Sequence, residues 1–179
     1  MKHLIWLVAV VLGGTGTAVA ADEAPQWPTQ DGDVTVVWQE PENYKDVRTG
    51  SGVQSRYQNH VFATLGKHLQ KRVTPLLQDG DKVTFTVTDL DLAGDVRPSF
   101  GRTSNDIRIV KSIYPPRMAF SYQVIDGSGE AIAQGEEDLR DMGFDTRSAG
   151  RYQNESLRYE MHMLDDWIRK DLTKQLEQR

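Results

Sequence analysis

Two stretches with helical spacing of apolar residues enclose a region in which apolar and polar residues alternate. Apolar residues recur at steps of three and four from Val53 to Val73, and again from Leu157 to Leu172, the pattern of amphipathic helices. The alternating runs, typical of strands with one buried face, predict a mostly antiparallel sheet of about five strands with both helices on one face. This is an α+β domain in the order β-α-β-β-β-β-α, with strands expected at 34–39, 82–89, 106–114, 117–125 and 130–139.

The second of these strands changes its inward-facing positions partway along. Apolar residues occupy odd positions from Val83 to Val87 and even positions at Leu90 and Leu92. Because side chains alternate between the two faces of a strand, such a change requires a bulge or a strand end. The sequence predicts that irregularity at Thr88 and the residue after it.

Aspartates cluster just after this change: Asp89, Asp91, Asp95 and Asp106 lie within eighteen residues. An EF-hand is excluded, because the position of its bidentate carboxylate holds Phe100. A looser calcium or magnesium site with Asp106 stays open, as does a catalytic carboxylate pair. We favour a structural interpretation, in which the aspartates turn outward, cap backbone N–H groups or pair with arginines.

Opposite charge comes from Arg108 and Arg117 near the predicted strand ends and from Arg56 on the first helix. Together with the aspartates, including Asp141, these arginines predict a charged cluster at one end of the sheet. Such a cluster either ties strand ends together or binds an anionic ligand, and we favour the tie. The candidate functional cluster is therefore Asp89, Asp91, Asp95, Asp106, Arg108, Arg117 and Asp141.

Other chemical signals are weak, so we assign no catalytic residue, metal ligand or cofactor. The chain has no cysteine and therefore no thiolate nucleophile or disulfide. His60 and His68 are spaced too far apart on one helix to chelate a single ion. His162 and Asp166 share the expected solvent face of the last helix, where ion pairs are ordinary.

The first residues predict export. Lys2 precedes an apolar run from Leu4 to Leu12, and small residues follow at Ala20 and Ala21, as in a secretory signal peptide cleaved after either alanine. We expect a signal peptide at 1–21, an extended lead-in at 22–33 and a single domain at 34–179. No second apolar segment predicts a membrane span. A net charge of −5 without a basic run argues against nucleic acid as a partner.

Four segments, in order, resemble a known family: "VTDLDLAGDVRP", "DIRIVKSIYPPR", "GEEDLRDMGF" and "YEMHMLDDWIRKDL". Together they are similar to exported proteobacterial proteins catalogued as domain of unknown function 3016, over about residues 34–172. The resemblance implies a periplasmic Gram-negative protein and carries no activity or cofactor. It also draws attention to Asp166 and Trp167, which we expect as a surface contact.

We therefore expect a soluble, non-enzymatic periplasmic binding or accessory domain. The bare face of the sheet or its acidic end would contact a periplasmic protein or a small anionic ligand, in an oligomeric state that the sequence leaves open. One alternative is a metal-assisted hydrolase that uses Asp89, Asp91 and Asp106. The other is an inhibitor of an envelope enzyme that uses the loop at 97–105.

Overall fold

The computed structural model describes residues 32–50, 52–97, 107–147 and 150–178. The predicted signal peptide and almost all of the predicted lead-in lie outside the described residues. Within these ranges, none of the helices combines the length and apolar composition needed to cross a bilayer.

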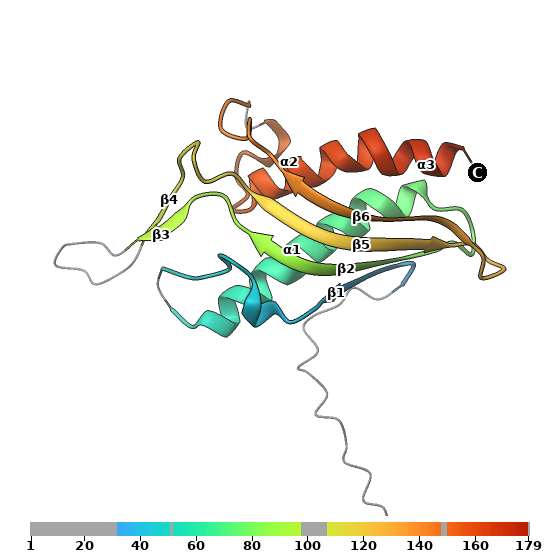
Figure 1. Ribbon diagram of the computed structural model, residues 1–179, viewed down its shortest axis with the longest axis horizontal. Helices are drawn as coiled ribbons and strands as arrows, with labels where there is room; N and C mark the ends of the chain where they lie inside the picture. The colour runs from blue at the N-terminus through green and yellow to red at the C-terminus, as the bar shows by residue number, and fades with distance from the viewer. Residues whose placement is uncertain (1–31, 51, 98–106, 148–149, 179) are drawn as a thin grey trace, which may run out of the picture.

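Four strands form the main sheet in the order β1-β2-β5-β6 (Figure 1). β1 (Val34–Trp38) pairs in parallel with β2 (Lys82–Asp91), whereas β5 (Arg117–Ile125) pairs antiparallel with both β2 and β6 (Ala131–Arg140). The parallel pair requires a crossover between its strands, which the first helix provides.

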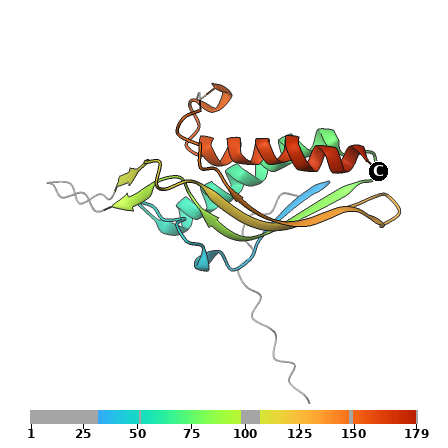
Figure 2. The same cartoon turned by 45° about the horizontal axis from the view of Figure 1, so that its top comes forward.

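Helices cover one face of this sheet, whereas no α-helix of the described residues lies on the other, which we call the bare face (Figure 2). α1 (Gln54–Val73) joins β1 to β2. The C-terminal helix runs without a break through α2 (Arg158–Trp167), a π-helical segment (Ile168–Leu172) and α3 (Thr173–Glu177). Apolar side chains of both helices and of the inner sheet face form one core, so the predicted α+β class is confirmed. Short 3-10 turns lie at Pro41–Asn43, Thr74–Leu76 and Gly150–Tyr152.

The π-helical segment has a packing cause. Leu164, Ile168, Leu172 and Leu176 are all buried and follow one another at steps of four. In an α-helix of 3.6 residues per turn, three such steps rotate the stripe by about 120°. The wider π turn removes part of that rotation, which keeps the late leucines over the sheet.

The main sheet has four strands, fewer than the predicted five, because the segment at 106–114 does not join it. Only β4 (Ile107–Ile109) is extended there, and it pairs with β3 (Asp95–Arg97), a strand too short to be recognised in the sequence. This two-stranded ribbon projects beyond the end of β2 (Figure 1). A turn closed by the N–H of Tyr114 and the carbonyl of Lys111 follows and leaves Ile113 70% exposed.

The last helix begins at Arg158, one residue after Leu157, the first residue of the apolar stripe in the sequence. Turns occupy the preceding residues, one of them closed by the N–H of Glu155 and the carbonyl of Tyr152. Leu157 consequently precedes the helix, although its side chain still reaches the core.

The predicted irregularity in the second strand is confirmed as a β-bulge. Val87 pairs with Phe120 and Asp89 pairs with Ala119, which leaves Thr88 without an opposite residue. After the bulge, Leu90 enters the core with 0% exposure. The same shift turns the carboxylates of β2 toward the bare face of the sheet.

Candidate functional site

The bulge brings Asp89 beside Arg117, which lies at the start of β5. The guanidinium of Arg117 donates from Nε and Nη2 to both carboxylate oxygens of Asp138 on β6, at 2.6 and 2.9 Å. Its Nη1 donates to Oδ2 of Asp89 at 3.1 Å. Hydrogen bonding to Arg117 lowers the pKa of Asp138. One arginine thus joins the ends of three neighbouring strands.

A second arginine, Arg108 on β4, joins two loops behind the sheet end. Its Nη1 donates to Oδ2 of Asp46 at 2.7 Å, and its Nη2 donates to the carbonyl of Arg48 at 3.2 Å. The backbone carbonyls of the turn at 92–94 also lie 3.4 to 3.5 Å from Nη1. Asp46 is only 6% exposed, so this pair is partly shielded from water.

Gly94 makes this turn possible. It adopts φ +90°, a conformation that residues with a Cβ rarely take. A Cβ at this position would lie 2.7 Å from the carbonyl oxygen of Ile109. The close approach of the turn to β4 therefore requires glycine.

These ion pairs surround a hollow of about 700 Å³ at the end of the sheet. We call it the sheet-end hollow. Its rim carries the exposed cationic side chains of Lys45 and Arg48, whose side chains are 69% and 64% accessible. Arg140, also exposed, influences Asp138 through its charge. The lining residues are Lys45, Asp46, Arg48, Asp91, Gly94, Asp95, Ile113, Tyr114, Pro115, Arg117, Asp138 and Arg140.

Two further predicted aspartates face this hollow, each beside a basic group. Asp91 is the less firmly held, since Nζ of Lys45 lies 3.8 Å from its Oδ2, and burial raises the pKa of its carboxyl group. Asp95 accepts a hydrogen bond of 2.9 Å from Nε of Arg97. The guanidinium of Arg97 also contacts the hydroxyl of Tyr114.

The arrangement is suited to binding polar groups. Asp106 lies outside the described residues. Among the residues that the structure describes, no three histidine or carboxylate side chains converge as metal ligands would. Asp89 and Asp91, the other residues of the proposed hydrolase, are engaged by Arg117 and Lys45.

Three remaining predicted residues lie away from the sheet-end hollow. Asp141, just after β6, is 7% exposed, and its Oδ1 accepts hydrogen bonds from the N–H of Gly143 and from Nη2 of Arg147. Asp166 is at the surface, 2.9 Å from Nη1 of Arg147. The expectation of a surface contact at Trp167 is wrong, because this side chain is 3% exposed and belongs to the core. Its ring lies 5.0 Å from that of Phe120.

A buried carboxyl group behind the sheet end was missed in the sequence. Glu160 on α2 is 2% exposed, and its Oε1 accepts the N–H of Ala93 at 2.8 Å. Burial raises the pKa of this carboxyl group. The sequence did contain a signal for this burial: position 160 follows Leu157 by three residues and precedes Leu164 by four, which places Glu160 on the apolar face of the helix.

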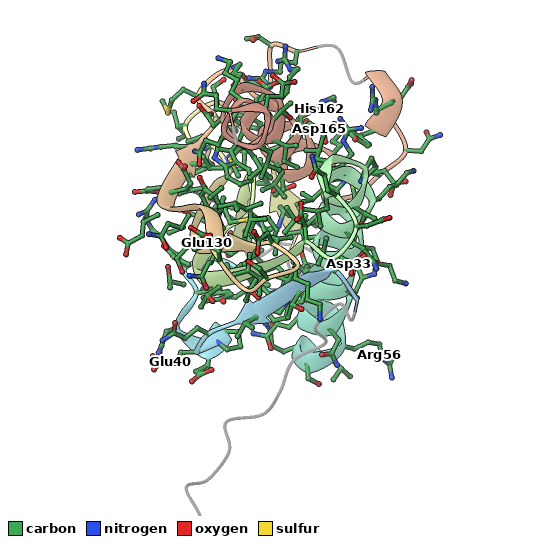
Figure 3. All side chains as sticks on the ribbon, turned by 90° about the vertical axis from the view of Figure 1, so that its right-hand side faces the viewer. Asp33, Glu40, Arg56, Glu130, His162 and Asp165 are labelled. Carbon is green, nitrogen blue, oxygen red and sulfur yellow. The ribbon has the colours of Figure 1, made fainter. Side chains whose placement is uncertain are left out.

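A network between the two helices was also missed. Oδ1 of Asp165 on α2 lies 3.0 Å from Nε2 of the buried His68 and 2.8 Å from Nε of Arg72, both on α1. The hydroxyl of Tyr152 donates to Oδ2 of Asp165 at 2.7 Å. Burial alone would raise the pKa of Asp165, but these hydrogen bonds and neighbouring charges hold it at about 2. Figure 3 labels Asp165 on the C-terminal helix, near α1.

A family model described as protein of unknown function (DUF3016) matches residues 32–170. This range includes every residue that lines the sheet-end hollow. No curated protein and no solved structure matches the chain.

Proposed function

The chain belongs to the DUF3016 family, and we propose that it is a non-enzymatic binding domain whose sheet-end hollow receives an anionic group. The source of that group is an acidic segment of a periplasmic protein or a small anionic ligand. The volume of about 700 Å³ falls within the usual range of ligand sites, roughly 300 to 1,000 Å³.

The charge distribution of the hollow carries this proposal. Its acidic side chains each have a basic group of the same chain nearby. Two of these groups, Lys45 beside Asp91 and Arg48 beside Asp46, still keep 69% and 64% of their side chains accessible. The lining holds as many basic as acidic side chains, four of each: Lys45, Arg48, Arg117 and Arg140, against Asp46, Asp91, Asp95 and Asp138. Clustered cations at a concave surface attract anionic groups.

Enzymatic function has less support from the same geometry. Ion pairs that join strand ends stabilise a fixed arrangement of the carboxylates, while acid-base catalysis needs a carboxyl group within reach of a substrate proton. Asp89 and Asp138 share one guanidinium, and hydrogen bonding to it lowers the pKa of Asp138.

The proposal is tested by reversing the rim charge. A double variant, Lys45→Glu with Arg48→Glu, is compared with a matched control on the exposed side of α1, Lys67→Glu with Lys71→Glu. Each protein is cross-linked in a periplasmic extract, and each is titrated by calorimetry with inorganic phosphate and with an oligoglutamate peptide.

We expect the wild type and the control to retain a common cross-linked protein, or to bind one of the two anions, and the rim variant to lose it. An effect confined to the peptide and the extract indicates a protein partner, and one confined to phosphate indicates a small ligand. Equal behaviour of the rim variant and the control would refute the proposal, as would the absence of binding in every arm.

The periplasmic location is part of this proposal and is supported by the pattern of residues 1–21. Export with cleavage after Ala20 or Ala21 gives a mature protein that begins at Ala21 or Asp22. N-terminal sequencing of the protein recovered by osmotic shock checks this expectation. An intact Met1 in the cytoplasmic fraction would contradict it.

A further inference from the structure

An exposed isoleucine belongs to the lining of the sheet-end hollow. Ile113 lies in the turn between β4 and β5 and is 70% exposed, and it lines the hollow together with Tyr114 and Pro115. Single exposed apolar residues are common on protein surfaces, so the informative point is its position within a concave, otherwise polar lining. The hollow thus combines a short apolar stretch with four basic and four acidic side chains.

Hydrogen bonds on both sides of Ile113 hold its turn in place. The carbonyl of Tyr114 accepts the N–H of Gly94 at 3.0 Å, which ties the turn to the residues after β2. On the other side, the hydroxyl of Ser112 contacts the carboxylate of Asp145, beyond the end of β6. The fold therefore anchors both neighbours of Ile113 and keeps its side chain away from the core.

Arg140 adds an unpaired positive charge to the same lining. It lies opposite Arg117 in the pairing of β6 with β5, and it is exposed. Arg117 forms ion pairs with Asp89 and Asp138, whereas Arg140 forms none with any carboxylate that the structure describes. A guanidinium with free N–H groups matches a carboxylate in a two-pronged geometry.

The two features together determine the class of ligand. A phosphate ion could pair with Arg140, but it would leave Ile113 exposed and would fill only part of a hollow that corresponds to about twenty water molecules at roughly 30 Å³ each. A long acyl chain with a carboxylate head would extend past the apolar stretch into the polar lining. A peptide places a carboxylate and an apolar side chain close together, which fits both features.

We propose that the sheet-end hollow recognises an acidic protein segment through two contacts, a carboxylate on Arg140 and a neighbouring apolar side chain on Ile113. This inference rests on the function proposed above, and it selects a protein segment over a small anion. Covering Ile113 removes apolar surface from water, which favours binding. The charged contact fixes the orientation of the segment and selects against basic partners.

Three capped peptides separate the two contacts when each is titrated by calorimetry into the full chain. They are Glu-Glu-Leu-Glu-Glu, Glu-Glu-Ser-Glu-Glu and Gln-Gln-Leu-Gln-Gln, and inorganic phosphate and octanoate are titrated in parallel. We expect the wild type to bind the acidic leucine peptide about tenfold more tightly than the serine peptide, because a leucine and an isoleucine bury part of their surfaces together. The uncharged peptide should bind more weakly than both.

Substitutions then assign each contact to its residue. Ile113→Ser should abolish the preference for leucine over serine and leave the affinity for the serine peptide unchanged. Its matched control is Ile107→Ser, since Ile107 is 53% exposed on β4 and is not part of the lining. Arg140→Gln should weaken the binding of both acidic peptides by about twofold to fivefold, whereas Arg56→Gln, at an exposed position of α1, should not.

Several results would overturn the inference without touching the proposed anion site. They are equal wild-type affinities for the leucine and serine peptides, binding of phosphate without any acidic peptide, and octanoate that binds as tightly as the leucine peptide. An unchanged preference for leucine in Ile113→Ser would exclude this residue as the apolar contact and refute the inference as stated. The absence of binding in every arm would refute the proposed function itself, and the inference with it.

Discussion

Replacing Asp165 with asparagine tests whether its carboxylate holds the two helices together. The pKa of Asp165 falls from an ordinary value of 3.8 to about 2, and each pKa unit corresponds to about 1.4 kcal/mol. The ionised carboxylate, with its side chain 15% accessible, therefore contributes about 2 kcal/mol to the free energy of unfolding. Asp165→Asn should lose roughly that amount at neutral pH.

The dependence on pH has a definite sign. Because the folded-state pKa is lowered, the contribution is complete above pH 3.8 and is lost as the pH falls through about 2. Urea unfolding of the wild type and the variant at pH 7 and pH 2 measures this change. The difference between the two proteins should shrink from about 2 kcal/mol to a few tenths of a kcal/mol.

The neighbouring residue supplies a matched control. Asp166 carries the same side chain on the same helix, but its partners are more accessible: the side chains of Arg169, Lys170 and Arg147 are 69%, 58% and 37% accessible. Asp166→Asn should cost at most about 1 kcal/mol, an effect that salt reduces. Equal losses in the two variants, or a loss for Asp165→Asn that is as large at pH 2 as at pH 7, would refute the reasoning.

Three further substitutions probe the sheet end, each followed by urea unfolding. Gly94→Ala should lower the free energy of unfolding by more than about 2 kcal/mol, because it adds a backbone clash to the strain of φ +90°. Gly129→Ala is the control, since this glycine has φ +89° with nothing within 4 Å of an added Cβ, and it should lower the free energy by only about 1 to 2 kcal/mol. Equal losses in the two variants would contradict the clash at Gly94. Glu160→Gln should stabilise the protein at neutral pH, because burial raises the pKa of Glu160 and disfavours its ionised form. This gain in stability should vanish below about pH 4, where the side chain at position 160 is uncharged in both proteins. A gain that persists at low pH would exclude burial of the charge as its cause. Arg108→Lys should lower the free energy of unfolding by about 1.5 to 3 kcal/mol, because lysine cannot reproduce the hydrogen bonds of the guanidinium to Asp46 and to the carbonyl of Arg48. A loss below about 0.5 kcal/mol would contradict this role of the guanidinium.

Sequence patterns predicted those features that a single segment determines. The change from odd to even apolar positions specified the bulge at Thr88, because only such an irregularity lets Val87 and Leu90 face the same core. The helical spacing that ends before Pro75 specified α1 to within a residue at each end. In both cases the constraint lies in neighbouring residues and needs no knowledge of the partner element.

The sequence patterns did not predict features that depend on contacts with a distant element. Alternating isoleucines around Ile107 predicted a longer strand of the main sheet, yet the chain turns after Ile109, before the two prolines. His68 and Glu160 lie on buried helix faces, and a buried polar residue is tolerated only where another segment supplies its partner. The partners, Asp165 and the N–H of Ala93, are distant in the sequence.

The pair Asp166 and Trp167 shows why adjacency in a helical sequence gives little information about a shared surface. Consecutive residues on a helix are separated by about 100°, so adjacent residues such as Asp166 and Trp167 can lie one outside and the other inside. Asp166 binds surface cations while Trp167 packs against the aromatic rings of β5. Both residues, together with Asp141, still line one shallow depression of the surface, because it lies where the helix meets the sheet. A motif of this kind is explained by the boundary between core and solvent, where a buried indole and an exposed carboxylate can line one site.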